Sequence, residues 1–333
     1  MSSHPKYKDE ESLDFDLGVD EYIEKYISRN SGPYSLHTPV WDLLDRGGKR
    51  FRPLLAHLCC KTVRGKSDPM ITSLAAAVEL LHNMTLIHDD IEDNSDVRRG
   101  KPCIHKIYGV PLAINTADFM AVKVFDMILS NGVDHATKVK ILQKIVERIL
   151  QMLHGQAIEI ESRQLKSYDV NLAVEIMKNK TAALVMLSSE IGSIIGGGDE
   201  TQIQLIQRYA GYAGLAFQIT DDILNLVATK KYGKEIGGDL REGKRTVIVS
   251  HYISNSSESD KNRILKNLGK KDTSEKEIKK MISLMEQKGS ISYARQLADF
   301  YLNCGLYYLW FLPDNDGRKS LVKLSRFLTR RTW

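Results

Sequence analysis

The sequence is poor in cysteine and has no long apolar run. Its four cysteines are scattered at Cys59, Cys60, Cys103 and Cys304. They are too few and too dispersed for a disulfide scaffold or a zinc site, so we expect reduced, structural thiols. No apolar run approaches the roughly 20 residues that span a bilayer. Residues 1–16 also lack the charged-then-apolar layout of a signal peptide. We therefore expect a cytoplasmic protein without a transmembrane segment.

A strong excess of one charge is missing as well. The 333 residues include 47 Lys and Arg against 42 Asp and Glu, and the formal net charge is +5. The basic residues are spread among acidic ones, without the aromatic-interleaved basic stripe of a nucleic-acid binder. We expect no nucleic-acid partner. A small polyanionic substrate suits this charge balance better.

Alternating strand patterns are absent, whereas helical periodicity is frequent. One run follows the i, i+3, i+4, i+7 spacing of a helix, at Ile71, Leu74, Ala75, Val78 and Leu81. Periodic segments predict helices near 18–28, 52–63, 69–93, 110–130, 136–163, 170–195, 200–228, 240–254, 276–287, 291–311 and 318–330. The polar segment 254–277 is expected to be a surface connection with a short helix, and it has no motif of evident chemistry. We expect a single all-α domain over 1–333, with 1–14 as a flexible segment.

Two acidic clusters stand near the ends of predicted helices. In the first, HDDIED at 88–93, Asp89 and Asp93 are four residues apart and project from one helix face. Like charges at that spacing repel by about 0.2–0.5 kcal/mol, and the helix dipole disfavours them further at a C-terminal end. The second cluster contains Asp221 and Asp222. Together they predict an oxygen-lined cage that suits Mg²⁺, which keeps waters and takes phosphate oxygens, better than zinc.

Basic loops accompany these clusters. The stretch GGKRFRP at 47–53 places flexible backbone beside three cations, and Arg98 and Arg99 closely follow the first acidic cluster. Amides and charged side chains together are well suited to grip an anion. Each segment alone is as often an ordinary solvated surface. Their combination predicts a diphosphate bound through magnesium and basic side chains.

These residues resemble the motifs of the trans-isoprenyl diphosphate synthase (polyprenyl synthetase) family, over most of the chain from about residue 35 to 330. The pattern is closest to that of geranylgeranyl diphosphate synthases. The family motifs DDxxD, RRG, GGKRxRP, GQ, KT and FQxxDD occur here at 89–93, 98–100, 47–53, 155–156, 180–181 and 217–222. The GKxxGxDxxEGKxT extension is represented by Lys234, Asp239, Lys244 and Thr246.

The resemblance implies an isoprenoid-synthase bundle of helices around a deep central cavity, usually a homodimer, with up to three Mg²⁺ ions per site. The implied reaction is head-to-tail condensation of isopentenyl diphosphate with dimethylallyl, geranyl or farnesyl diphosphate, by ionisation, condensation and elimination. Asp89, Asp93 and Asp221 would ligate metal, with Asp90 and Asp222 in support. Arg98, Lys180, Lys234 and Lys244 would bind the allylic diphosphate. Lys49, Arg52, His82 and Arg99 would bind isopentenyl diphosphate. Lys180, Thr181 and Gln218 would face the carbocation.

Two positions depart from the family pattern. Asn225 replaces the final acid of the second aspartate motif, and Glu159 stands where Asp is common. Asparagine still offers an oxygen, although it carries no charge. The first change is also similar to geranylgeranyl diphosphate synthases of the eukaryotic kind, so we interpret it as subgroup variation.

The product length should depend on residues that precede Asp89 on its helix. Met84 and Thr85 lie about 6–7.5 Å deeper, where farnesyl diphosphate synthases commonly carry aromatic side chains. A flexible Met and a small Thr should let a longer chain pass, to a floor at Leu81, Phe119 or Met120. We favour a geranylgeranyl product, with farnesyl and longer polyprenyl products as alternatives. The other interpretation is that Met84 only packs against the core and does not limit the length of the product.

Two further possibilities were weighed. A class I terpene cyclase would share the helical fold and the metal chemistry. Asp221-Asp222 together with Lys49, Arg52 and Arg99 argue against it. The basic C-terminus 330–333 is either a cover for the isopentenyl site or a solvated tail.

Overall fold

The computed structural model describes residues 17–30, 34–165, 168–227 and 236–329. The segment 1–14, Lys234 and the tail 330–333, for which the sequence raised expectations, lie outside the described residues.

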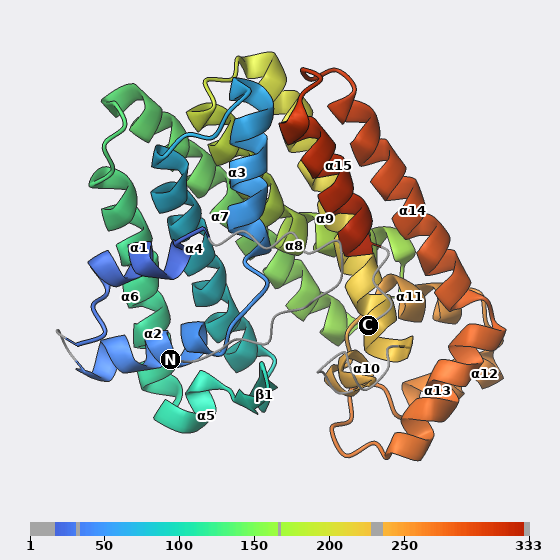
Figure 1. Cartoon of the computed structure of the whole chain (residues 1–333). Helices are drawn as coiled ribbons and strands as arrows, with labels where there is room; N and C mark the ends of the chain where they lie inside the picture. The colour runs from blue at the N-terminus through green and yellow to red at the C-terminus, as the bar shows by residue number, and fades with distance from the viewer. Residues whose placement is uncertain (1–16, 31–33, 166–167, 228–235, 330–333) are drawn as a thin grey trace, which may run out of the picture.

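The described chain is almost wholly helical, as the sequence predicts (Figure 1). Its helices are α1 (Val19–Tyr26), α2 (Tyr34–Asp45), α3 (Phe51–Arg64), α4 (Met70–Glu92), α5 (Ile104–Tyr108), α6 (Val110–Leu129), α7 (His135–Leu165), α8 (Val170–Ile195), α9 (Glu200–Val227), α10 (Gly238–Glu242), α11 (Val247–Ser254), α12 (Glu258–Leu265), α13 (Glu275–Gln287), α14 (Ser290–Leu309) and α15 (Asp316–Thr329). Most predicted helices are confirmed within a few residues, including the short helix in 254–277, which is α12.

Three details differ from the sequence-based expectation. The predicted helix 240–254 is two helices, because Gly243 ends α10 in the left-handed conformation, with φ 73°, and Thr246 then caps α11 by accepting a hydrogen bond from Val249 N–H. Helix α2, which contains Pro39, and the five-residue helix α5 were not predicted. A two-stranded antiparallel hairpin, β1 (Val97–Arg98) and β2 (Lys101–Pro102), replaces the expected loop at the RRG motif.

Helix α8 lies at the centre of the fold and packs against α3, α4, α7 and α9 (Figure 1). Every residue from Ala182 to Gly196 is buried, the pattern of a helix enclosed on all sides. Helix α3 comes so close that a Cβ at Gly192 would lie 2.2 Å from the Ala56 carbonyl oxygen. Only glycine fits this crossing.

A buried ion pair joins α7 to α8. Glu190 is fully buried, and its two carboxylate oxygens accept hydrogen bonds of 2.8 and 2.7 Å from Arg148 Nε and Nη2. A bidentate pair of this kind compensates the burial of both charges and fixes their relative orientation. It therefore holds the two long helices in register along one wall of the bundle.

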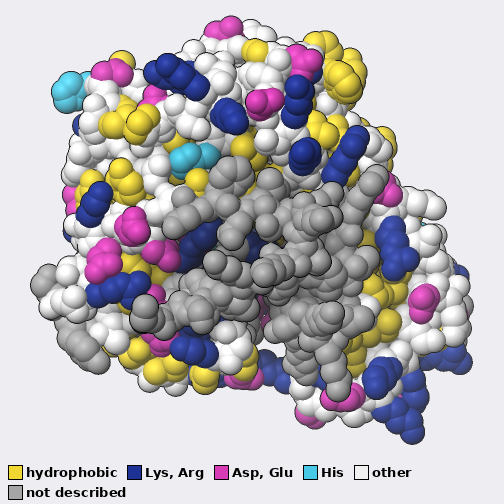
Figure 2. Space-filling model, viewed as in Figure 1, with side chains coloured by type: hydrophobic (Ala, Val, Ile, Leu, Met, Phe, Trp, Pro, Cys, Tyr) yellow, Lys and Arg dark blue, Asp and Glu magenta, His cyan; other side chains and the backbone are white. Residues whose placement is uncertain are grey.

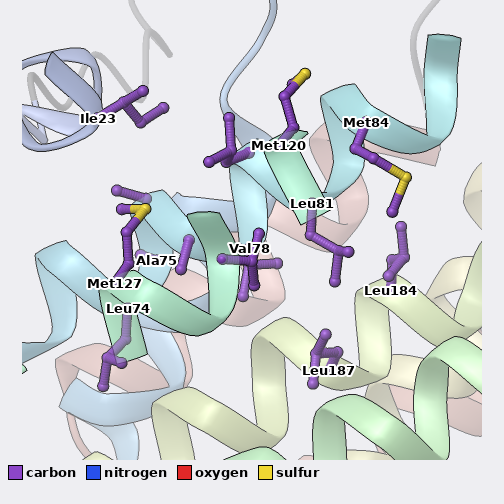
Figure 3. Close-up of a cluster of buried hydrophobic side chains, with 14 of the residues drawn as sticks. Ile23, Leu74, Ala75, Val78, Leu81, Met84, Met120, Met127, Leu184 and Leu187 are labelled. Atoms are coloured by element: carbon purple, nitrogen blue, oxygen red, sulfur yellow. The ribbon is translucent and has the colours of Figure 1, made fainter. Parts of the chain in front are cut away.

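Helix α4 is, among the described helices, the one long and apolar enough to cross a membrane by length and composition. In this fold, 72% of its most apolar window is buried, and it packs against α1, α3, α6 and α8. Figure 3 shows its side chains Leu74, Val78 and Leu81 in an apolar cluster with residues of α6 and α8. Burial in the core of the bundle therefore explains why α4 is so apolar.

Candidate active site

The helices surround a cavity of about 1070 Å³ whose lining includes residues of both acidic clusters and of the basic loops. Its mouth is polar, with Asp89, Asp221 and Lys244 in the lining, and its interior is apolar, with Ile149 and Leu184 among the residues there. The cavity suits an elongated ligand with an anionic head and a hydrocarbon tail.

The two outer aspartates of the first cluster are each paired with a cation from a neighbouring helix. Asp89 Oδ1 lies 2.8 Å from Lys180 Nζ, and Asp93 Oδ1 accepts a hydrogen bond of 2.7 Å from Arg163. Burial raises the pKa of Asp93, although Lys244 opposes that change. The expected cationic compensation is therefore present, and protein side chains supply it in this structure.

Asp90 has a different environment from Asp89 and Asp93. It is buried, and its Oδ1 accepts hydrogen bonds of 2.9 and 2.5 Å from Arg98 Nε and Nη2. Neither Asp90 nor Asp93 is in the cavity lining, whereas Asp89 and Arg98 are. Asp90 therefore orients Arg98 toward the mouth of the cavity. In this way it would support the binding of an anion without contacting the anion itself.

Glu159, one of the departures from the family pattern, connects the two ion pairs of the first cluster. Its oxygens accept hydrogen bonds of 2.7 Å from Lys180 and 2.8 Å from Arg163. Burial alone would raise the pKa of Glu159, but these two cations lower it to about 2. None of the sequence motifs indicates a role for Arg163. Arg163 follows Glu159 by four residues and therefore shares its helix face, and this spacing could have indicated the ion pair.

The second acidic cluster forms a chain of hydrogen bonds across two helices. Thr181 Oγ1 on α8 donates to Gln218 Oε1 on α9 at 3.1 Å, and Gln218 Nε2 donates to Asp222 Oδ1 at 2.8 Å. Burial, Asp239 and Asp221 raise the pKa of Asp222 well above its usual range, although the hydrogen bond from Gln218 opposes this. The three predicted residues Thr181, Gln218 and Asp222 thus form one connected unit.

Asn225 holds the turn that follows this cluster. Its side-chain oxygen accepts a hydrogen bond of 3.2 Å from Asp239 N–H, and its backbone carbonyl accepts one of 2.8 Å from Gly237 N–H. These bonds bring Asp239 to the cavity lining, near Asp222. The sequence comparison placed Asp239 in a motif without giving it a role. The replacement of an acid by Asn therefore fits a residue that binds backbone.

Lys244 lies in the same turn as Asp239. Its Nζ is 2.7 Å from Glu242 Oε2 and 3.3 Å from Asp239 Oδ1. Burial would lower the pKa of Lys244, but Asp239, Glu242 and Asp93 raise it well above its usual range. It therefore stays charged beside the mouth, where an anion would bind.

The predicted isopentenyl-site residues Lys49, Arg52, His82 and Arg99 all line the cavity. Arg99 Nη1 donates to the Leu43 carbonyl at 3.3 Å, and its guanidinium lies so close to Gly48 that a Cβ there would be 3.1 Å from Nη2. The RRG hairpin and the glycine loop thus pack against each other.

This group of cations has an excess of positive charge. Burial lowers the pKa of Arg52, and its buried Nε has no hydrogen-bond partner among the described residues. Burial and the nearby guanidinium groups lower the pKa of Arg99 to about 10. Burial and the same neighbours hold the pKa of His82 well below its usual range. A buried donor without a partner, beside several further cations, indicates that an anion completes this site.

The described residues include no group of three or more His, Cys, Asp or Glu side chains arranged to hold a metal ion by themselves. The carboxylates near the mouth are nevertheless hard oxygen donors, and two of them, Asp93 and Asp222, have raised pKa values because burial leaves their charge poorly solvated. Such a set fits Mg²⁺, which binds few carboxylates and takes further oxygens from water and phosphate.

Met84 and Thr85 line the apolar part of the cavity, as predicted. Met84 on α4 and Leu184 on α8 point toward one another there (Figure 3). The deeper candidates Leu81, Phe119 and Met120 are not in the lining: Leu81 and Met120 are buried in the core, and Phe119 stacks on His37. Of these candidates for the floor, Met84 and Thr85 are therefore the ones that line the cavity.

Comparison with known proteins gives a consistent result. The polyprenyl synthetase family model matches residues 33–285. The chain is 36% identical to a short chain isoprenyl diphosphate synthase of Methanocaldococcus jannaschii, over 95% of this chain and 94% of that protein. A solved geranylgeranyl pyrophosphate synthetase of Pyrococcus horikoshii superposes with a TM-score of 0.88 at 35% identity, covering 94% of this chain and 95% of the other. A geranylgeranyl pyrophosphate synthase of Corynebacterium glutamicum, solved with isoprenyl diphosphate and magnesium, superposes at 0.86 and 26% identity, covering 94% and 96%.

Glu159→Gln should destabilise the protein in a pH-dependent way. Because the folded-state pKa of Glu159 is lowered from 4.5 to about 2, its ion pairs stabilise the fold above pH 4.5, and this stabilisation is lost as the pH falls toward 2. We expect a deficit of about 3 kcal/mol in the free energy of unfolding at pH 7, shrinking to less than half at pH 3. Denaturant titrations at both pH values measure it.

The exposed neighbour Glu161 on the same helix is the matched control. Glu161→Gln should change the free energy of unfolding by less than about 0.5 kcal/mol at either pH. An equal deficit of Glu159→Gln at pH 7 and pH 3 would show that the charge of Glu159 is not what stabilises this cluster.

Proposed function

The chain belongs to the polyprenyl synthetase family and is an isoprenyl diphosphate synthase, a transferase; on that premise we propose that it extends allylic diphosphates with isopentenyl diphosphate, making chiefly geranylgeranyl diphosphate. The observation that carries the proposal is the division of one cavity into an acidic and a basic polar region above an apolar interior. Two diphosphates with hydrocarbon tails would fill these regions. The cytoplasmic location expected from the sequence is part of the proposal.

The acidic region is the proposed site of the allylic diphosphate. Asp89, Asp93 and Asp221 would hold Mg²⁺, with Asp222 and Asp239 beside them, and the bound metal would stabilise negative charge on the leaving diphosphate. Lys180 and Lys244 now pair with carboxylates at 2.8 and 2.7 Å. Both ammonium groups line the cavity, where they would contact the oxygens of a bound diphosphate.

Arg98 and Lys234 complete the proposed allylic set. Arg98 is held from behind by Asp90 through two hydrogen bonds, so little conformational freedom is lost when it binds an anion. Lys234 lies outside the described residues, and its assignment rests on the family motif alone.

The basic region is the proposed site of isopentenyl diphosphate. Lys49, Arg52 and Arg99 supply positive charge without a metal, and an incoming diphosphate would give the buried Arg52 Nε an acceptor. The low pKa of His82 keeps its ring neutral at pH 7, so it can donate a hydrogen bond without adding to the crowding of cations.

The reaction needs a stabilised cation between these two regions. The allylic C–O bond breaks, the double bond of isopentenyl diphosphate attacks the carbocation to form the new C–C bond, and a proton passes to the departing diphosphate. Thr181 donates its hydroxyl proton to Gln218, which leaves the hydroxyl lone pairs to face the cation. Gln218 is fixed in turn by Asp222. This series of hydrogen bonds orients the side-chain dipoles of Thr181 and Gln218 before the positive charge of the carbocation develops.

A homodimer is part of the proposal, and an exposed apolar face on α6 and α7 supports it. The side chains of this face are between 42% and 66% exposed, and they are Ile114, Val122, Leu129, Val139, Val146, Leu150 and Leu153. On α7 their spacing is that of a helix–helix seam.

Purified protein with Mg²⁺, isopentenyl diphosphate and farnesyl diphosphate should form a twenty-carbon product, and EDTA should abolish it. Asp89→Asn and Asp221→Asn should each lower kcat/KM at least about 100-fold, whereas the exposed Asp299→Asn should not. Chromatography of the products measures this. Release of diphosphate with a cyclic hydrocarbon would favour a terpene cyclase instead, and activity in EDTA would exclude the metal.

Met84→Phe should shorten the main product from twenty to fifteen carbons, because a rigid ring would fill the space before Leu184 through which the chain must pass. Met84→Leu, of similar volume, is the control and should keep the longer product. Product lengths are resolved after incubation with dimethylallyl diphosphate. An unchanged twenty-carbon product from Met84→Phe would place the floor elsewhere.

Val146→Lys should weaken the dimer at least about tenfold, since two copies of the buried charge meet in a symmetric interface. Sedimentation equilibrium measures the dissociation constant. Trp310→Lys, at an exposed aromatic residue directly after α14, should leave it unchanged. A monomeric wild type, or a Val146→Lys dimer as tight as the wild type, would contradict pairing through this face.

A further inference from the structure

The connection between α12 and α13 approaches the mouth of the cavity. We call residues 266–273 of this connection the strap. The sequence indicated no chemistry here, yet Lys271 lines the cavity together with residues of both acidic clusters. The strap therefore contributes to the site from a segment with no family motif.

The strap is fixed to the turn that carries Asp239 and Lys244. Gly269 N–H donates to the Leu240 carbonyl at 2.9 Å, and Arg241 Nε donates to the Thr273 carbonyl at 3.2 Å. Gly243 and Gly269 both have positive φ, 73° and 79°, and a Cβ at Gly243 would lie 3.0 Å from Gly269 Cα. The backbones of strap and turn are therefore in direct contact.

The other end of the contact is the loop that follows the first acidic cluster. Lys271 Nζ donates to the Asn94 carbonyl oxygen and lies 3.9 Å from Asp96 Oδ2. Asn94 directly follows Asp93, at the C-terminal end of α4, where the helix dipole favours a cation. A second link nearby runs from Ser95 Oγ to Glu242 Oε1, at 3.4 Å. Lys271 thus bridges the two acid-bearing elements across the mouth.

We propose that Lys271 is a positioning residue that fixes the gap between the end of α4 and the Asp239–Lys244 turn. A diphosphate bridged by metal ions must reach carboxylates on both sides of this gap, so its affinity depends on their separation. The strap sets that separation through backbone contacts to the turn and one ammonium contact to the α4 end. This inference rests on the proposed magnesium-dependent condensation.

Lys271→Ala should raise the Mg²⁺ concentration for half-maximal activity, and the KM for farnesyl diphosphate, about fivefold to tenfold. The KM for isopentenyl diphosphate should stay within about twofold, because that site lies on the basic side of the cavity. Activity at saturating Mg²⁺ should largely recover. Lys271→Arg should restore the wild-type values, since it keeps a cation that can reach the Asn94 carbonyl.

Lys270→Ala is the matched control, because Lys270 is the exposed neighbour in the same strap and does not line the cavity. It should behave like the wild type. Calorimetric titration of Mg²⁺ and inorganic pyrophosphate into each variant gives a readout independent of turnover, and only Lys271→Ala should bind more weakly.

Three outcomes would overturn the inference while the wild type remains active: equal Mg²⁺ requirements in Lys271→Ala and Lys270→Ala, an equal rise in KM for both substrates, or a Lys271→Arg variant as impaired as Lys271→Ala. Absence of condensation in the wild type would instead count against the proposed function. The pyrophosphate titration would then still decide whether Lys271 tunes metal-dependent anion binding.

Discussion

The rest of this structure depends on the compensation of like charges buried around one cavity. Asp89 and Asp93 share a helix face at a helix end, where both repulsion and the dipole oppose them. Lys180 and Arg163 neutralise them, and Glu159 holds those two cations in place. Five charges on α4, α7 and α8 thus form one alternating chain. The helices cannot shift relative to one another without separating some of these charges.

Lys49, Arg52 and Arg99 are kept apart from these carboxylates, in another region of the same cavity. Figure 2 shows acidic and basic side chains interspersed over one outer face of the molecule, so the separation belongs to the interior and not to that surface. Helix α4 contributes to both regions: Asp89 lies in the acidic one and His82, about two turns earlier on the same face, in the basic one, while Asp90 pairs with Arg98. A mixed arrangement would let the carboxylates neutralise the arginines and leave no site for a second anion.

Helical periodicity predicted most of the fold because the buried helices carry long, regular apolar stripes. It failed at three places: α2 contains Pro39, which is unfavourable inside a helix, and α5 has only five residues. The apolar residues on either side of Gly243 form one pattern although the backbone turns there. For the site, the motifs indicated which residues come together, because the spacing of residues along a helix determines which side chains share a face. They did not indicate that Asp90 faces Arg98, that Glu159 connects two ion pairs, or that Lys271 reaches Asn94 from 177 residues away. These are tertiary contacts, for which local sequence carries no signal.

The contact between α3 and α8 at Gly192 affects the geometry of the active site. Helix α3 begins just after Lys49 and carries Arg52 of the basic region, and α8 carries Lys180 and Thr181 of the acidic region. In the proposed function, each helix would therefore hold one of the two reactants. Their crossing is set by backbone contact at Gly192, where even a methyl group would lie 2.2 Å from a carbonyl oxygen. Bond formation requires reacting carbons within about 3–3.5 Å. In the proposed function, the absence of a side chain at Gly192 would therefore set the separation of the two substrates, although neither substrate would touch this residue.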